Sequence, residues 1–200
     1  MSVEPIMAKL VLVTGASASG KTTVGMELAR RLGVEYADAD DFHPPANIAK
    51  MRSGEPLSDA DREPWLAAIV DWLGDRARGG AVASCSALRR AHRDRLRAAA
   101  TAVVFVQLRV PEAVLRERLR ARSGHFMPES LLDSQLETLE ALEPDEHGVT
   151  IDGQLPVDVA VTTVLGWAVP LQSVGTLPEV GTGWPRPTSD ISCRRPRAEC

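Results

Sequence analysis

The 200-residue chain has little of what would mark a secreted, membrane or nucleic-acid-binding protein. Its three cysteines, Cys85, Cys193 and Cys200, make no disulfide framework, which favours a reduced, cytoplasmic protein. No apolar run reaches the length of about 18 residues that a membrane span needs, and the opening MSVEPIMAKL lacks a secretion signal. The net charge of −4 gives no reason to expect nucleic-acid binding.

One eight-residue stretch carries a specific chemistry. The sequence GASASGKT, residues 15–22, has two glycines followed by Lys and Thr in the spacing of a phosphate-binding loop. Gly15 and Gly20 allow a tight turn whose backbone N–H groups can approach phosphate oxygens. Lys21 supplies a cation for the outer phosphates, and the Thr22 hydroxyl can ligate Mg²⁺. The stretch therefore predicts a site for a nucleoside triphosphate with its metal ion.

Strand and helix signals alternate along the chain. An apolar strand at 10–13 precedes the loop, and a helix at 23–32 follows it, with Gly33 placed to end that helix. Further strands are expected at 34–37, 81–84, 103–108 and 149–151. Further helices are expected at 47–52, after the capping residue Ser58, after residue 88, after Pro111, through 131–139 and at 157–169. This alternation predicts an α/β fold, with a parallel sheet flanked by helices on both faces.

The composition changes near residue 170. The segment 170–200 holds five of the 14 prolines and few periodic apolar residues, so we predict that it is a disordered tail. One domain is expected to occupy residues 1–169.

An acidic stretch, Asp38-Ala39-Asp40, follows the second expected strand, where open α/β sheets bind ligands. In extended geometry the side chains of Asp38 and Asp40 would point the same way and could face one site. On these residues alone, a ligand site and a solvated acidic turn are equally supported. The arginines that follow the third strand, between 89 and 97, are for the most part expected to form a solvated helix face.

Further stretches, taken in order over about residues 9 to 168, resemble the gluconokinases, a family of small P-loop kinases. They include Asp38-Ala39-Asp40 with His43-Pro44, Gly54-Glu55-Pro56-Leu57, Cys85-Ser86-Ala87-Leu88, Arg122 with Gly124-His125-Phe126, Ser134-Gln135, Thr138-Leu139-Glu140 and Pro144-Asp145-Glu146. Position 92 departs from the pattern, since the family often has Tyr where this chain has His92. The resemblance implies a nucleoside-monophosphate-kinase-like fold, a homodimer, and ATP-dependent phosphorylation of D-gluconate at its 6-hydroxyl.

The resemblance also implies residue roles. It assigns catalysis to Lys21, Asp40 and Arg122. It assigns ATP binding to Gly15, Ala16, Ser17, Ala18, Ser19, Gly20, Lys21, Thr22, Thr23, Arg118 and Arg122. It assigns gluconate binding to Asp40, His43, Arg62, Arg89, Arg93, His125 and Gln135. These side chains offer cations for the carboxylate of gluconate and polar groups for its hydroxyls. It assigns Mg²⁺ binding to Thr22 and Asp38. The third strand ends in Ser84-Cys85-Ser86 and so lacks an acidic residue that could bind the metal, which leaves this role to Asp38.

Two other functions stay open at the level of sequence. One is a kinase of the same architecture that acts on shikimate or another small sugar acid. The other is a nucleotide-binding switch without a small-molecule acceptor, although the chain has no Asn-Lys-x-Asp motif for guanine recognition.

Overall fold

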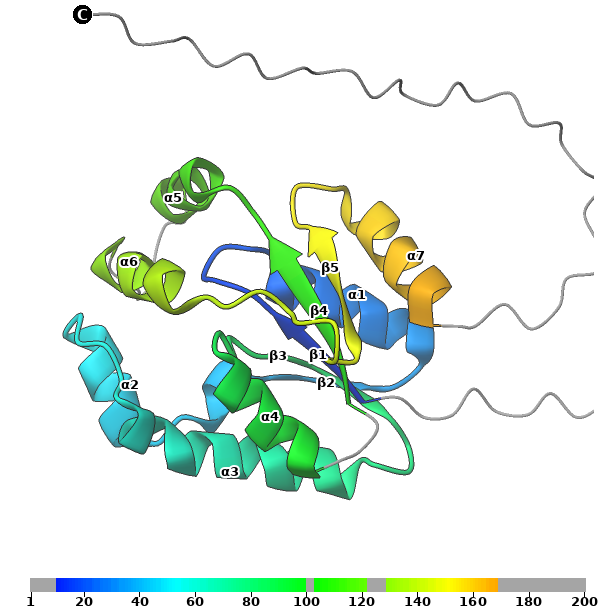
Figure 1. The fold of residues 1–200 in the computed structure, drawn as a ribbon, viewed down its shortest axis with the longest axis horizontal. Helices are drawn as coiled ribbons and strands as arrows, with labels where there is room; N and C mark the ends of the chain where they lie inside the picture. Colours follow the sequence, from blue (N-terminus) through cyan, green and yellow to red (C-terminus); the bar gives the residue numbers. More distant parts are fainter. Residues whose placement is uncertain (1–9, 100–102, 122–128, 169–200) are drawn as a thin grey trace, which may run out of the picture. The chain divides into compact units, whose positions relative to one another are not determined.

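The computed structural model describes residues 10–99, 103–121 and 129–168. Five strands form a wholly parallel sheet in the order β2-β3-β1-β4-β5 (Figure 1). The strands are β1 (Leu10–Thr14), β2 (Glu35–Asp38), β3 (Ala81–Ser84), β4 (Val103–Arg109) and β5 (Gly148–Asp152). The helices are α1 (Lys21–Leu32), the 3-10 helix η1 (Ala39–Phe42), α2 (Pro45–Arg52), α3 (Asp59–Asp75), α4 (Arg90–Ala99), α5 (Glu112–Ala121), α6 (Glu129–Thr138) and α7 (Val157–Ala168).

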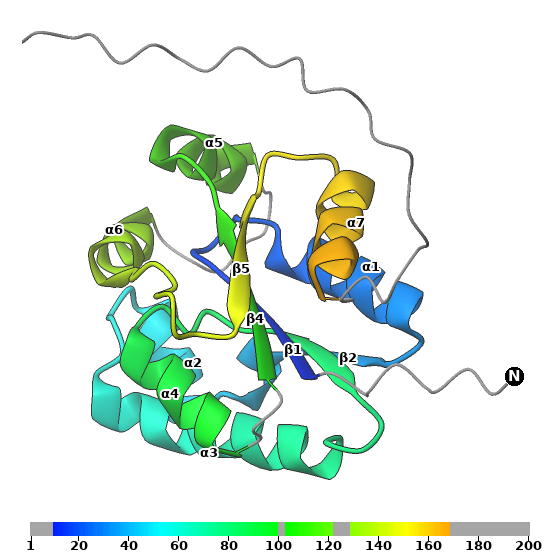
Figure 2. The same ribbon diagram turned by 45° about the vertical axis from the view of Figure 1, so that its right-hand side comes forward.

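The central strand β1 supplies apolar side chains to both faces of the sheet, because successive residues of a strand point in opposite directions. Leu10 and Leu12 join the core beneath α3 and α4, whereas Val11 and Val13 join the core beneath α1 and α7. The two views show these helix pairs on opposite faces of the sheet (Figures 1 and 2). The predicted α/β architecture is therefore confirmed, with β1 buried at its centre.

The predicted elements are all present, with small shifts at their ends. The third strand occupies the predicted residues, whereas the second begins and ends one residue later, at Glu35–Asp38. Ser58 caps α3 in a reciprocal box with Asp61, because each residue's side chain accepts from the other's backbone N–H. Among the described residues no helix has both the length and the apolarity to cross a membrane. The tail predicted at 170–200 lies outside those residues and stays a prediction.

One local expectation is wrong. The chain is not extended through Asp40, because η1 begins at Ala39, directly after β2. Asp38 caps this turn, and its Oδ1 accepts a hydrogen bond from the Asp40 backbone N–H at 3.1 Å. The rule that side chains two residues apart in a strand share a face therefore does not apply here. The directions of the Asp38 and Asp40 carboxylates are set by the 3-10 turn instead.

Helices α5 and α6 lie past the carboxyl ends of the strands (Figure 1). Leu115 and Leu119 of α5 and Leu132 of α6 form a small apolar cluster with Ala16 of the phosphate loop. This packing holds the two helices against the loop and so forms one side of the site described below.

A glycine of α1 provides a test of the packing between α1 and β2. A Cβ atom on Gly25 would lie 2.8 Å from Cε2 of Tyr36, whose hydroxyl is hydrogen-bonded to Ser84 Oγ at 2.8 Å. A Cβ atom on Gly74, in α3, would meet nothing within 4 Å. Gly74→Ala should raise the free energy of unfolding by about 0.5–1 kcal/mol through helix propensity. Gly25→Ala should lower it by about 1 kcal/mol, because overpacking outweighs the same propensity gain. Urea unfolding of both variants measures the difference, and equal stabilisation by both would contradict this account.

Candidate active site

The loop between β1 and α1 has the backbone conformation that phosphate binding requires. Gly15 has a φ of 141°, and a Cβ atom there would lie 2.8 Å from the carbonyl oxygen of Leu108. Gly20, with a φ of 99°, immediately precedes α1. Both positions therefore exclude an ordinary side chain. The first turn of α1 directs its N–H groups and the positive end of its dipole toward the loop.

Three polar groups of the loop have defined surroundings. The Lys21 Nζ atom donates to the Ala16 carbonyl oxygen at 3.0 Å, so the ammonium group folds back over the loop. The Ser17 backbone N–H donates to Gln135 Oε1 of α6 at 2.7 Å. The Ser19 hydroxyl is buried without a hydrogen-bond partner among the described residues. A buried hydroxyl beside backbone donors fits a cradle for phosphate oxygens.

Thr22 and Asp38 place two hard oxygen ligands beside the loop. The Thr22 hydroxyl donates to Asp38 Oδ2 at 3.1 Å. Across the sheet, Asp38 is paired in register with Ser84, whose side chain is engaged by Tyr36. A carboxylate and a hydroxyl suit Mg²⁺, which takes its remaining ligands from water and phosphate. The two residues thus fit the predicted metal role. Within residues 10–99, 103–121 and 129–168, no group of three or more His, Cys, Asp or Glu side chains is arranged to hold a metal ion.

The structure brings most of the predicted acceptor-binding residues into one pocket beside the phosphate loop. Asp40, His43, Arg62, Arg89 and Gln135 all line it, and Lys21 and Ser17 of the loop form its boundary with the phosphate site. Four more polar lining residues were not predicted as site residues, namely Ser86, His92, Ser134 and Thr138. Three of the four lie inside stretches that resemble the family, and His92 is the position that departs from it, so the sequence did carry a signal for them.

Two arginines and one histidine of this pocket share a single carboxylate. Asp59 oxygens lie 3.3 Å from Arg62 Nη1, 3.0 Å from Arg89 Nη1 and 3.6 Å from His92 Nε2. Burial lowers the pKa of the Arg62 guanidinium. The pKa of His92 is also lowered, mainly by burial and to a smaller extent by the positive charge of Arg62. An arginine stays protonated at neutral pH even so. The cluster therefore carries two guanidinium charges against one carboxylate, and it favours an anion in the pocket.

His43 is held as a neutral ring in the same pocket. It stacks on Trp65 with ring centroids 4.6 Å apart, and its Nδ1 lies 3.4 Å from Asn47 Nδ2. Burial, followed by the charge of Arg62, lowers the pKa of His43 to about 4. Because the Asn47 amide nitrogen can only donate, Nδ1 accepts and the ring proton resides on Nε2. His43 thus offers the pocket a hydrogen-bond donor rather than a charge.

A second pocket lies on the other side of the phosphate loop. Ser19, Gly20 and Thr23 line it together with residues of α7 and with Arg118 of α5. Arg118 donates to the Ala18 carbonyl at 3.3 Å and to the Gly153 carbonyl at 3.1 Å. Arg118 and Thr23 therefore lie beside the loop, and their contacts with ATP stay a prediction.

Among the described residues, Arg93 is the predicted acceptor-binding residue that the structure places outside the acceptor pocket. Arg122 and His125 lie outside the described residues. Arg93 is fully buried, and its guanidinium is paired with Glu146 at 2.6 Å instead of lining the acceptor pocket. The structure therefore gives Arg93 a role in the protein interior, because a guanidinium enclosed by protein acceptors offers no donor to a substrate.

Comparisons with known proteins agree with this geometry. A family model described as an AAA domain matches residues 10–142. A gluconokinase of Gluconobacter oxydans is 45% identical over 159 residues, which cover 78% of this chain and 89% of the relative. The crystal structure of a gluconokinase from Sinorhizobium meliloti 1021 superposes with a TM-score of 0.74 at 44% identity, covering 81% of this chain and 92% of that one.

The chain belongs to the gluconokinase family. A shikimate kinase from Aquifex aeolicus is also similar, with a TM-score of 0.51 over 78% of this chain and 94% of that one, but at 18% identity it shares only the fold. The family membership and the two pockets beside the phosphate loop point to the same class of chemistry.

The buried His43 ring predicts a pH dependence of stability. The unfolded chain takes up a proton on His43 below its ordinary pKa of 6.5, whereas the folded chain resists protonation until about pH 4. Between these values the unfolded state binds more protons, so stability falls as the pH falls. Wild-type protein should therefore lose more unfolding free energy across this window than His43→Gln.

Urea unfolding at several pH values measures this slope. Equal slopes for wild type and His43→Gln would show that the buried ring does not resist protonation.

Proposed function

We propose that this protein is a gluconokinase that transfers the γ-phosphoryl group of ATP to the 6-hydroxyl of D-gluconate, giving 6-phospho-D-gluconate and ADP. The observation that carries the proposal is the phosphate loop between two pockets. One pocket is cationic and holds Asp40, and the other is bounded by the loop, α7 and Arg118. A phosphoryl group held on the loop is thereby within reach of an acceptor on the opposite side.

The loop supplies positioning and electrostatic stabilisation, which dominate catalysis of phosphoryl transfer. Backbone N–H groups of residues 15–22 bind the phosphate oxygens, and the Lys21 ammonium moves from the Ala16 carbonyl to the transferring group. Thr22 and Asp38 would hold Mg²⁺, which when bound offsets charge on the phosphate oxygens. Arg118 borders the nucleotide, and Arg122 is proposed to join it there as a second cation.

Asp40 is the proposed general base. Its carboxylate lines the acceptor pocket together with Lys21. It accepts the proton of the sugar hydroxyl as the phosphoryl group is transferred, and it also orients that hydroxyl by a hydrogen bond. Asp38 is kept for the metal, because its two oxygens already face Thr22 and the Asp40 backbone.

The acceptor pocket suits an anion that carries hydroxyls. Arg62 and Arg89 supply charge for the gluconate carboxylate, and Asp59 holds both guanidiniums in place. His43, Gln135, Ser134 and Thr138 add neutral polar groups, and His125 is proposed to contribute another. A neutral sugar would leave the two cations without a partner, and a switch protein would have no use for this pocket.

Family resemblance also supports a homodimer that acts in the cytoplasm. The proposed partner is the small-molecule acceptor, with no nucleic acid or membrane involved.

The acceptor preference tests the function directly. In a coupled ADP-release assay, gluconate should give the highest kcat/KM among gluconate, shikimate, other sugar acids and neutral sugars. Glucose should be poorer by about 10²-fold or more, because the two cations of a pocket built for a carboxylate would gain no anionic ligand. A clear preference for shikimate or for a neutral sugar would refute the proposal.

The two acidic residues should give separable phenotypes. Asp40→Asn should lower kcat by about 10²–10⁴-fold and raise the KM for gluconate, because a base and a hydroxyl acceptor are lost together. Asp38→Asn should instead raise the Mg²⁺ concentration needed for half-maximal rate. Separate titrations of Mg²⁺ and gluconate for each variant distinguish them. If the two patterns are exchanged, the roles are reversed, and if neither variant loses tenfold in rate, the acidic turn is not catalytic.

A further inference from the structure

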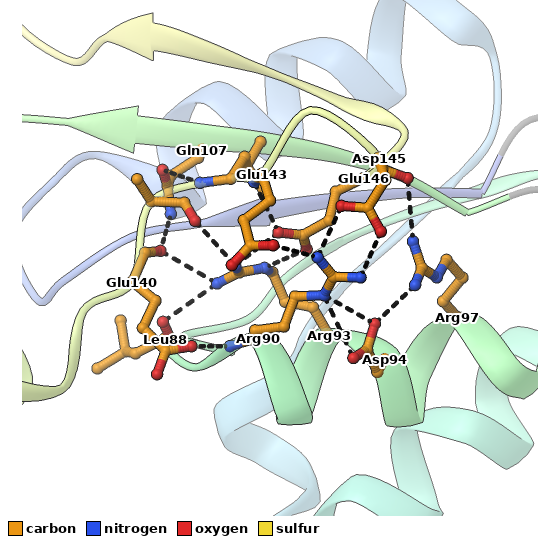
Figure 3. Close-up of polar contacts among 12 residues, drawn as sticks. Leu88, Arg90, Arg93, Asp94, Arg97, Gln107, Glu140, Glu143, Asp145 and Glu146 are labelled. Carbon is orange, nitrogen blue, oxygen red and sulfur yellow. Dashed lines mark hydrogen bonds and ion pairs between the residues drawn. The ribbon is translucent and has the colours of Figure 1, made fainter.

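Arg93 and Glu146 form a fully buried ion pair away from both pockets. Their side chains are 0% and 1% exposed, and two hydrogen bonds of 2.6 and 2.8 Å join them (Figure 3). Burial by itself raises the pKa of Glu146, but the hydrogen bonds from Arg93 and from the Glu143 backbone outweigh it and hold that pKa low. The pair is therefore ionised inside the protein, a costly arrangement that calls for an explanation.

The remaining donors of Arg93 reach backbone carbonyls of two different segments. Nη1 donates to the Leu88 carbonyl at 3.1 Å and to the Glu140 carbonyl at 3.2 Å, and Nη2 donates to the Ala141 carbonyl at 3.1 Å. With the two bonds to Glu146, all five N–H donors of the guanidinium are used. One side chain thus joins the segment between β3 and α4 to the segment between α6 and β5 (Figure 3).

Further contacts fix the same junction. The Glu140 backbone N–H donates to the Leu88 carbonyl at 2.9 Å. Gln107 of β4 donates to the Glu140 carbonyl at 2.9 Å and accepts from the Leu142 backbone N–H at 3.3 Å. The chain leaving α6 is therefore tied to the sheet as well as to α4.

Each of the joined segments carries one wall of the acceptor pocket. Ser86, Leu88 and Arg89 lie in the segment before α4. Gln135 and Thr138, which line the same pocket, lie in the last turn of α6, directly before the clamped residues. The guanidinium therefore links the two segments that carry these lining residues.

We propose that Arg93 is a positioning residue that sets the geometry of the acceptor pocket by clamping α6 against the β3–α4 segment through Glu146 and three carbonyls. The inference rests on the proposed function for the identity of the acceptor. Neither Arg93 nor Glu146 touches the substrate. Arginine suits this position because a lysine has three donors on a single nitrogen and cannot span separated acceptors.

The test must separate positioning from simple stability, because removing one member leaves a buried charge unpaired. The paired replacement Arg93→Met with Glu146→Leu removes both charges and keeps an apolar, folded interior. Arg93→Lys keeps the charge opposite Glu146 but loses the carbonyl bonds. Arg90→Gln is the matched control, because Arg90 joins the same segments through Asp145 and Glu143, whose side chains are 63% and 61% exposed.

In the paired variant and in Arg93→Lys, KM for gluconate should rise about tenfold while KM for ATP changes less than about twofold, since the walls of only one pocket shift. Arg90→Gln should keep both values. Hydrogen exchange of the Glu140 and Leu142 amides should accelerate in the two Arg93 variants but not in Arg90→Gln. A folded paired variant with the wild-type KM for gluconate overturns the inference.

The exchange measurement also keeps this inference separate from the proposed function. If the wild-type enzyme phosphorylates no gluconate, the proposed function fails. The clamp is then judged on amide exchange alone, and wild-type protection of Glu140 and Leu142 in the paired variant overturns it.

Discussion

The structure depends on one constraint, that backbone N–H groups can bind a polyanion only when the loop that carries them is held rigidly. Here the loop starts from β1, which is buried on both faces, and ends in the first turn of α1. The Gly15 backbone lies so close to the Leu108 carbonyl that no side chain fits between them. Packing of α5 and α6 on Ala16 closes the third side. The loop is thus fixed by the core rather than by its own residues.

The two pockets follow from that position. Because β1 is central, the strands on its two sides bring different side chains to the same edge of the sheet. The β2 side provides Asp38, Asp40 and His43, whereas β4 and β5 lead to Arg118 and the Gly153 carbonyl beneath it. Lys21, the first residue of α1, lines the pocket on the β2 side.

Charge in this protein acts in different ways according to burial. Arg62 and Arg89 border a pocket and keep capacity for an incoming anion, since one exposed carboxylate serves both. Arg93 is enclosed, and every donor is used within the protein. Burial keeps His43 neutral, so it contributes a donor without adding a third charge to the cluster. An arginine of this protein can therefore border a pocket or join segments of the interior, depending on how deeply it is buried.

The sequence by itself determined the phosphate loop and the alternation of strands and helices. These features are local, because glycine spacing, apolar periodicity and caps such as Ser58 act within a few residues. Only the tertiary structure decided how Asp38 and Asp40 are directed, since a 3-10 turn replaces the extended chain between them. It also decided that Arg93 pairs with Glu146, 53 residues away, rather than with a substrate. A contact of that kind depends on how α4, α6 and β5 pack, and no spacing in the sequence encodes it.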